Sequence, residues 1–118
     1  MQINDPAMKE RVAKAVSDRH VREIVSATIA RAKSASELSG ELGIPVRSVY
    51  RYLEELSSLG LLTGERSVLM NSGGRYTLYR SMVKSVTVKY GGGSLEVDLV
   101  PNEDLLDRFM RFWRYMSR

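Results

Sequence analysis

Residues 34–62 read SASELSGELGIPVRSVYRYLEELSSLGLL, and this stretch decides the fold. Ser34 and Glu37 have the spacing of a capping box, which predicts that a helix begins directly after Ser34. Gly43 stands where a helix ends through a left-handed residue, and Pro45 stands where another helix can begin. The stretch therefore predicts two short helices joined by a tight turn.

The spacing within this pair is typical of a helix-turn-helix. Val49, six residues after Gly43, is a branched apolar side chain that fills the space between two such helices, and Ser39 is small enough to let them approach closely. In DNA-binding proteins of this kind the second helix places its N-terminal side chains in the major groove. Arginine can bind guanine with two hydrogen bonds, and serine or tyrosine can reach phosphates or base edges. The candidate base-reading residues are Arg47, Ser48, Tyr50 and Arg51.

A hairpin is predicted directly after the helix pair. Strand-like runs cover residues 61–70 and 75–82, and the intervening Asn71, Ser72, Gly73 and Gly74 are a strong turn signal. A helix-turn-helix followed by such a hairpin, or wing, describes a winged helix. Wing side chains contact phosphates and add affinity more than sequence choice. The candidate wing contacts are Arg66, Asn71, Ser72 and Arg75.

The flanking segments predict further helices and a second hairpin. Helices are expected over residues 7–16 and after Asp18, because Asn4 or Asp5 before Pro6, and Asp18 itself, are helix-start signals. Apolar and polar residues alternate over 85–90 and 94–99, which predicts a hairpin turning at three glycines. The hairpin needs a partner for its apolar face, either the last helix or a partner subunit.

A last helix is predicted from Pro101 to about Ser117. Its apolar side is too wide for the surface helix of a monomer, so we expect it to form a homodimer interface as well as core. The interface candidates are Leu105, Phe109, Phe112, Trp113 and Met116. The expected class is mainly α with a small β part (α+β): a winged-helix DNA-binding domain over 1–82, then a hairpin and dimerisation helix over 83–118.

Charge permits nucleic-acid binding without requiring it. The chain of 118 residues carries 18 Lys and Arg against 14 Asp and Glu, a net charge of +4. The excess is local, because residues 63–82 hold Arg66, Arg75 and Arg80 against Glu65 alone. We therefore expect double-stranded DNA as the partner, while the identity of any small-molecule effector stays open.

Composition also excludes several classes of protein. The chain has no cysteine and a single histidine, His20, which excludes disulfides, a thiolate metal site and a histidine metal cluster. No acid–base pair or nucleophile constellation stands out, so we expect no enzyme, no catalytic residue and no cofactor. The apolar runs are far shorter than the roughly 20 residues that cross a bilayer, and no secretory leader is visible. A cytoplasmic protein without a membrane partner is expected.

The run from Lys14 to Leu62 resembles the DNA-binding core of ArsR-type winged-helix transcriptional regulators, especially the archaeal branch. The family's KALSDPTRxxIL corresponds to KAVSDRHVREIV, its SELAxxLGL to SELSGELGI, and its TVSRHLxxLxxxGLV to SVYRYLEELSSLGLL. The resemblance extends to about Arg80. It implies a homodimer that binds duplex DNA near promoters, with one recognition helix per half-site. Metal-sensing members carry cysteines at the level of residues 36–40, or an Asp/His set on the last helix, and this chain has neither.

A second class of function stays open at this point. Winged helices also serve as protein–protein modules in transcription or chromatin assemblies, and a fold alone does not decide between the two. The mild net charge is compatible with either.

Overall fold

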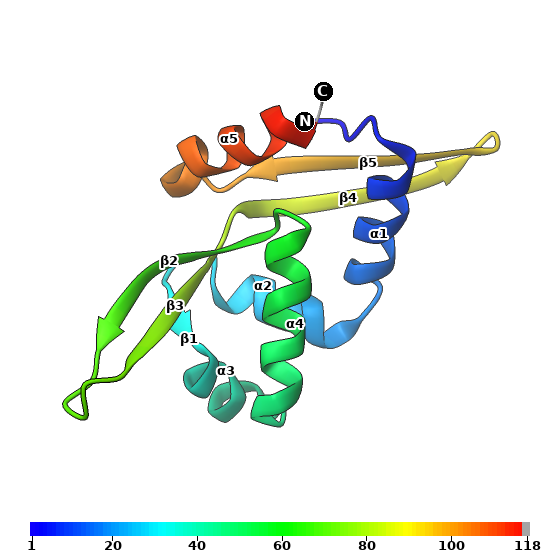
Figure 1. Cartoon of the computed structure of the whole chain (residues 1–118). Coiled ribbons are helices and arrows are strands. Elements are labelled where there is room, and N and C mark those ends of the chain that lie inside the picture. Colours follow the sequence, from blue (N-terminus) through cyan, green and yellow to red (C-terminus); the bar gives the residue numbers. More distant parts are fainter. Residues whose placement is uncertain (117–118) are drawn as a thin grey trace.

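The computed structural model describes residues 1–116, and the expected α+β class is confirmed for them (Figure 1). The helices are α1 (Pro6–Val16), α2 (Arg19–Ala27), α3 (Ala35–Leu42), α4 (Val46–Ser58), the short 3₁₀ helix η1 (Glu103–Leu105) and α5 (Leu106–Met116). The strands are β1 (Lys33–Ser34), β2 (Leu62–Leu69), β3 (Arg75–Ser81), β4 (Val83–Gly91) and β5 (Ser94–Pro101). Ser117, the predicted end of the last helix, lies outside the described residues.

α1, α2 and α3 begin where local capping signals predict them, whereas the predicted start of the last helix at Pro101 is wrong, because Pro101 ends β5 and α5 begins at Leu106 after η1. Asp5 and Asp18 each accept a backbone N–H in the first turn of α1 and α2, at 3.1 and 2.8 Å. Ser34 and Glu37 make both bonds of the predicted capping box at the start of α3, at 3.1 and 3.2 Å. These bonds satisfy N–H groups that have no partner within the helix itself.

The turn between α3 and α4 has the predicted left-handed glycine. Gly43 has a φ of +67°, a conformation that costs other residues roughly 1–2 kcal/mol. The Ser39 hydroxyl donates to the carbonyl of Ile44 at 2.6 Å, so this small residue also closes the turn. Val49 is completely buried between the two helices, as its spacing predicts.

The β2–β3 hairpin belongs to a three-stranded antiparallel sheet of order β1-β3-β2. β1, which the sequence did not predict, pairs Lys33 with Tyr79 and Ser34 with Leu78, so it covers only the inner half of the β3 edge. The register between β2 and β3 shifts between Gly64 and Arg66, which makes Glu65 the extra residue of a β-bulge.

The β4–β5 hairpin forms a separate two-stranded sheet. The N-terminus pairs along its β5 edge, where Ile3 N–H donates to the carbonyl of Val97 at 2.9 Å and Leu99 N–H to that of Met1 at 2.8 Å. Val97 and Leu99 are buried, and they belong to the same core as the inner faces of α1 and α5. The chain therefore covers the β5 part of the hairpin's apolar face, whereas Val88 and Tyr90 of β4 remain 40% and 73% exposed.

The junction of the two sheets contains a buried cation. Arg80 is 9% exposed, and its guanidinium donates to the carbonyl of Ile29 at 2.8 and 3.0 Å, to Glu65 at 3.2 Å and to Asp104 at 2.6 Å. Burial alone would lower the pKa of Arg80, but Asp104 and Glu65 hold it above the ordinary arginine value. Arg80 therefore does not add to the exposed basic charge of the hairpin, contrary to the charge count made from sequence.

α5 is packed against the body of the chain. Phe109 and Trp113 are almost fully buried and Leu105 is 8% exposed, so three of the five predicted interface residues lie in the chain's own core. Phe112 is half-buried beside Gly60. The apolar side chains that α5 leaves exposed are a different set, which shares only Met116 with the prediction: Leu106, Met110, Tyr115 and Met116.

The two ends of the molecule are built from different parts of the chain. α3, the start of α4 and the tip of the β2–β3 hairpin lie at one end, while α5 and the β4–β5 hairpin lie at the other (Figure 1). No helix in the described part of the chain is long and apolar enough to cross a membrane.

Candidate nucleic-acid interface

α4 has one buried and one exposed side over its first two turns. Its buried side chains recur at helical spacing and pack into the core: Val49, Tyr52, Leu53 and Leu56. Because 3.6 residues make a turn, the positions between them face outward. Arg47, Tyr50 and Arg51 are exposed and Ser48 is half-buried, so the four predicted base-reading residues share the exposed side of the first two turns.

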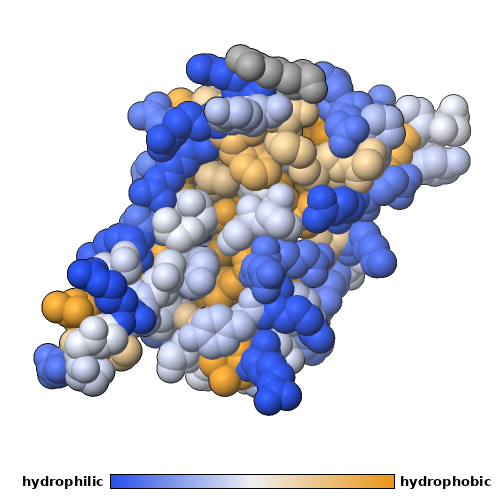
Figure 2. All heavy atoms as spheres, in the orientation of Figure 1, coloured by the Kyte–Doolittle hydropathy of each residue, from blue (hydrophilic) through white to orange (hydrophobic). Residues whose placement is uncertain are grey.

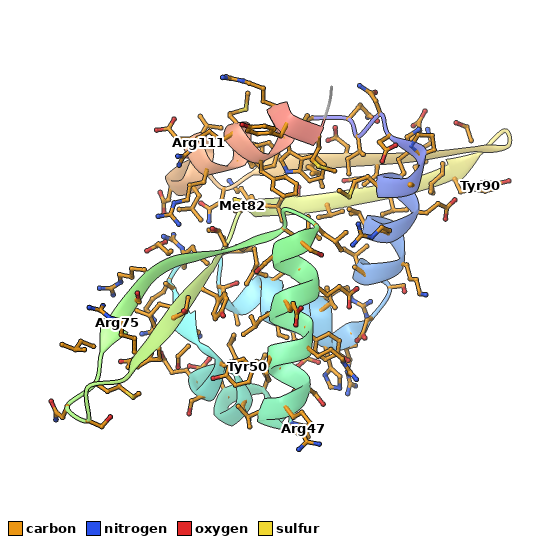
Figure 3. The ribbon with its side chains drawn as sticks, in the orientation of Figure 1. Arg47, Tyr50, Arg75, Met82, Tyr90 and Arg111 are labelled. Atoms are coloured by element: carbon orange, nitrogen blue, oxygen red, sulfur yellow. The ribbon has the colours of Figure 1, made fainter. Side chains whose placement is uncertain are left out.

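The two arginines of α4 differ in their surroundings. Arg47 makes no hydrogen bond or ion pair with any other described residue, and it lies at the free start of the helix (Figure 3). The guanidinium carbon of Arg51 lies 5.2 Å from the ring centroid of Tyr52, within range of a cation–π contact. Arg47 is therefore unpartnered among the described residues, whereas Arg51 contacts the neighbouring Tyr52 ring.

The tip of the β2–β3 hairpin presents polar groups at the end of a tight turn. Gly73 N–H donates to the carbonyl of Met70 at 3.0 Å, and this turn places Asn71 and Ser72 at its exposed corner. Gly73 has a φ of +88°, which explains the glycine at that position.

The predicted arginines of this hairpin project from opposite faces. Arg66 lies opposite Leu78 and Arg75 lies opposite Leu69 in the ladder, and side chains alternate between faces along each strand. Both arginines are exposed and have no hydrogen-bond or ion-pair partner among residues 1–116. Arg66 and Arg75 therefore do not act on one surface, although the sequence placed them together.

A groove of about 810 Å³ separates the hairpin from α3 and α4, and the surface is visibly hollowed there (Figure 2). Tyr50 lies on the side of α4 that faces the hairpin (Figure 3), and Arg75 of β3 is also among the residues that line the groove. The groove thus brings together one predicted residue from each element. Its lining residues are Ser34, Ala35, Ser36, Glu37, Tyr50, Met70, Arg75, Tyr76, Thr77 and Tyr79.

Two further tyrosines of the groove were not among the predicted site residues. Tyr79 lies on the same face of β3 as Arg75, as the alternation of side chains along residues 75–79 predicts. Tyr76 alternates to the other face but also lines the groove, next to the part of the β3 edge that β1 leaves uncovered. No sequence signal shows that edge, because it depends on where the two-residue strand β1 pairs.

A hydrogen bond ties the exposed helix to the body of the protein. The Tyr52 hydroxyl donates to Asp18 at 3.0 Å, and burial, together with that carboxylate, raises the pKa of Tyr52. Burial would raise the pKa of Asp18, but the backbone N–H of His20 and the Tyr52 hydroxyl lower it below the ordinary value. α4 is therefore held in place at its middle, while its first turn projects outward.

Comparison with known proteins identifies no relative. No protein-family model matches the chain, and no curated protein is significantly similar to it in sequence. The resemblance to ArsR-type regulators therefore remains a prediction from the motifs.

Proposed function

We propose that this chain is a DNA-binding transcriptional regulator of the winged-helix type, in which α4 is the recognition helix and the β2–β3 hairpin is the wing. The observation that carries the proposal is the groove shared by Tyr50 of α4 and Arg75 of β3. A helix and a hairpin that meet at one end of the molecule can contact the same duplex. The guanidinium groups of Arg47 and Arg75 have no partner among the described residues and are available to an anionic partner.

α4 and the β2–β3 hairpin would make different kinds of contact with DNA. Side chains of the first two turns of α4 would enter the major groove and read base edges: Arg47, Ser48, Tyr50 and Arg51. Arg75, with Asn71 and Ser72 at the tip, would bind the phosphates beside that groove. Arg66, on the other face of the wing, would attract the DNA electrostatically without contacting the phosphates that Arg75 binds.

The dimer implied by the resemblance would use the exposed apolar residues of α5. Leu106 and Met110 are one helical turn apart and are 46% and 47% exposed. A second copy docked there would leave both recognition helices free, since α5 lies at the other end of the molecule (Figure 1). Sedimentation equilibrium tests this point: changing Leu106 and Met110 to lysine should yield monomers, whereas an unchanged mass would place the interface elsewhere.

The proposal is tested by comparing variants on an operator selected from genomic duplex fragments. Arg47→Ala and Arg51→Ala should each weaken binding by about 1–3 kcal/mol and relax the sequence preference. Arg111→Ala is the matched control, because Arg111 is an exposed arginine of α5 at the other end of the molecule (Figure 3). Unchanged operator affinity in the Arg47→Ala, Arg51→Ala double variant would rule out α4 as the recognition helix.

A protein–protein module is the second candidate function, and one observation favours it. Leu69 and Met70, next to the wing tip, are 61% and 41% exposed, and exposed apolar side chains often mark protein contacts. Changing Leu69, which does not line the groove, to serine separates the two functions. A DNA-binding wing keeps most of its affinity for DNA, whereas a protein-binding wing loses its partner.

A further inference from the structure

We propose that the groove between α4 and the wing binds an unpaired nucleotide of DNA, with its base stacked on Tyr50 and its phosphate paired with Arg75. This inference rests on the proposed function, because it assigns a more specific ligand to the same face. The groove is a recess between two elements that the proposed function places on the same duplex, and the flat base of an unpaired nucleotide can turn into such a recess. Its volume of about 810 Å³ lies within the roughly 300–1,000 Å³ typical of small-ligand sites.

The hydroxyl groups and rings of the three groove tyrosines have no hydrogen-bonding or aromatic partner within residues 1–116. Tyr50, Tyr76 and Tyr79 make no ring contact and no hydroxyl hydrogen bond with any other residue of the described chain. Tyr50 is 56% exposed and Tyr76 is 40% exposed, so their ring faces are open to a ligand. Aromatic faces that lie along a cationic groove are the usual platforms for unpaired bases, because every base has a face that can stack.

The charges of the groove favour an anion. Arg75 contributes a guanidinium that no described carboxylate neutralises. The one acid of the lining, Glu37, is already engaged, because it accepts the Ser34 N–H at 3.2 Å and lies 3.6 Å from Arg31. The remaining polar lining consists of hydroxyl groups from Ser34, Ser36 and Thr77. Ser34 already accepts the Glu37 N–H, while Ser36 and Thr77 can donate to or accept from a base edge.

The test compares three DNA ligands at about 50 mM salt, where phosphate contacts are strong. These are a paired 20-base-pair duplex, the same duplex with one unpaired 2-aminopurine, and the single strand. We expect the duplex with the unpaired base to bind at least about fivefold more tightly than the paired duplex, the lower end of what one stacked base contributes. Stacking on Tyr50 should also quench the 2-aminopurine emission.

Substitutions separate stacking from hydrogen bonding. Tyr50→Leu should abolish both the preference and the quenching, whereas Tyr50→Phe should keep both because it retains the ring. Tyr76→Leu should reduce the preference in part. Tyr90→Leu is the matched control, since Tyr90 is 73% exposed at the tip of the β4–β5 hairpin, far from the groove (Figure 3).

Each possible result of these binding measurements either supports or overturns the assignment of the groove. Equal affinity for the paired and unpaired duplexes, or a preference that survives Tyr50→Leu, overturns the assignment of the groove and leaves duplex recognition by α4 intact. No binding to any of the three ligands overturns the proposed function and this inference together.

Discussion

The hydroxyl of Tyr52 donates a 3.0 Å hydrogen bond to Oδ2 of Asp18, whose other oxygen caps α2. One carboxylate thus joins the middle of α4 to the start of α2. This bond adds to the core packing of Val49, Leu53 and Leu56, which together hold α4 and the exposed residues of its first two turns.

Removing this carboxylate should destabilise the protein in a pH-dependent way. Asp18→Ala loses both a helix cap and the acceptor of Tyr52, so we expect a loss of about 1–2 kcal/mol at neutral pH. The pKa of Asp18 is lowered in the folded state. Its stabilising effect is therefore complete above the unfolded value of about 4 and is lost as the pH falls through the lower folded value.

Urea denaturation of wild type and Asp18→Ala at pH 7, pH 5 and pH 3 measures this difference. The difference in stability between the two proteins should be smallest at pH 3. A difference that stayed constant across this range would show that the charge of Asp18 contributes nothing. Tyr52→Phe, which keeps the ring and loses only the hydroxyl, shows how much of the effect belongs to the bond between the two residues.

The wing arginine should act on affinity rather than on sequence choice. Arg75 has no partner within the described chain, so its proposed contact is to phosphate. Arg75→Ala should weaken binding to all duplexes alike and reduce the slope of log affinity against log salt by about one. Fluorescence anisotropy on the operator and on an unrelated duplex measures both quantities. A loss confined to the operator would instead assign Arg75 to base reading.

Arg80 should be essential to stability although it lies in the wing. Its removal leaves the carboxylates of Glu65 and Asp104 without this donor, while the carbonyl of Ile29 keeps only the Asn102 amide at 2.9 Å. Breaking such a buried pair costs roughly 3–5 kcal/mol. Because Asp104 is 66% exposed, we expect Arg80→Ala to lie at the lower end of that range. Arg66→Ala, an exposed arginine of the same hairpin, should change stability by less than about 0.5 kcal/mol. Equal losses in the two variants would contradict this role of Arg80.

Two left-handed glycines offer a matched comparison. Gly43 and Gly60 have φ values of +67° and +71°, but a Cβ at Gly43 would meet nothing within 4 Å, whereas one at Gly60 would lie 2.3 Å from the Phe112 ring. Gly43→Ala should therefore cost only the backbone strain of about 1–2 kcal/mol. Gly60→Ala should cost about 1–3 kcal/mol more, because α5 must shift. Thermal denaturation of both variants tests this, and equal losses would show that Phe112 moves aside freely.

Signals close in sequence predicted the central helices well. The capping box of Ser34 and Glu37, the left-handed Gly43 and the burial of Val49 each depend on residues within one or two helical turns. Such features follow from backbone geometry, which a single sequence already encodes.

Features that depend on distant residues could not be predicted in this way. Arg80 and Ile29 are 51 residues apart, so nothing local distinguishes this arginine from the exposed Arg66 and Arg75. The residues predicted to form an interface on α5 could not be told apart from core residues for the same reason: their contacts are with residues distant in sequence. A wide apolar stripe shows that a helix is covered, but only the packing shows that Phe109 and Trp113 are covered by the chain itself.

The sequence predicted exposed residues of the candidate site, but it did not predict the groove that some of them line. The exposed side of α4 follows from helical periodicity, and it is present in the structure. The groove does not follow from any local pattern, because it requires α3, α4 and the outer half of the β3 edge to lie together.

The central claim is that this chain binds duplex DNA through several phosphate contacts, and one measurement tests it most directly. The purified protein is titrated onto mixed genomic duplex fragments at several salt concentrations, and binding is followed by fluorescence anisotropy. We predict tight binding whose log affinity falls steeply and linearly with log salt, since each neutralised phosphate adds about 0.9 to the slope. An absence of binding even at low salt would contradict the claim.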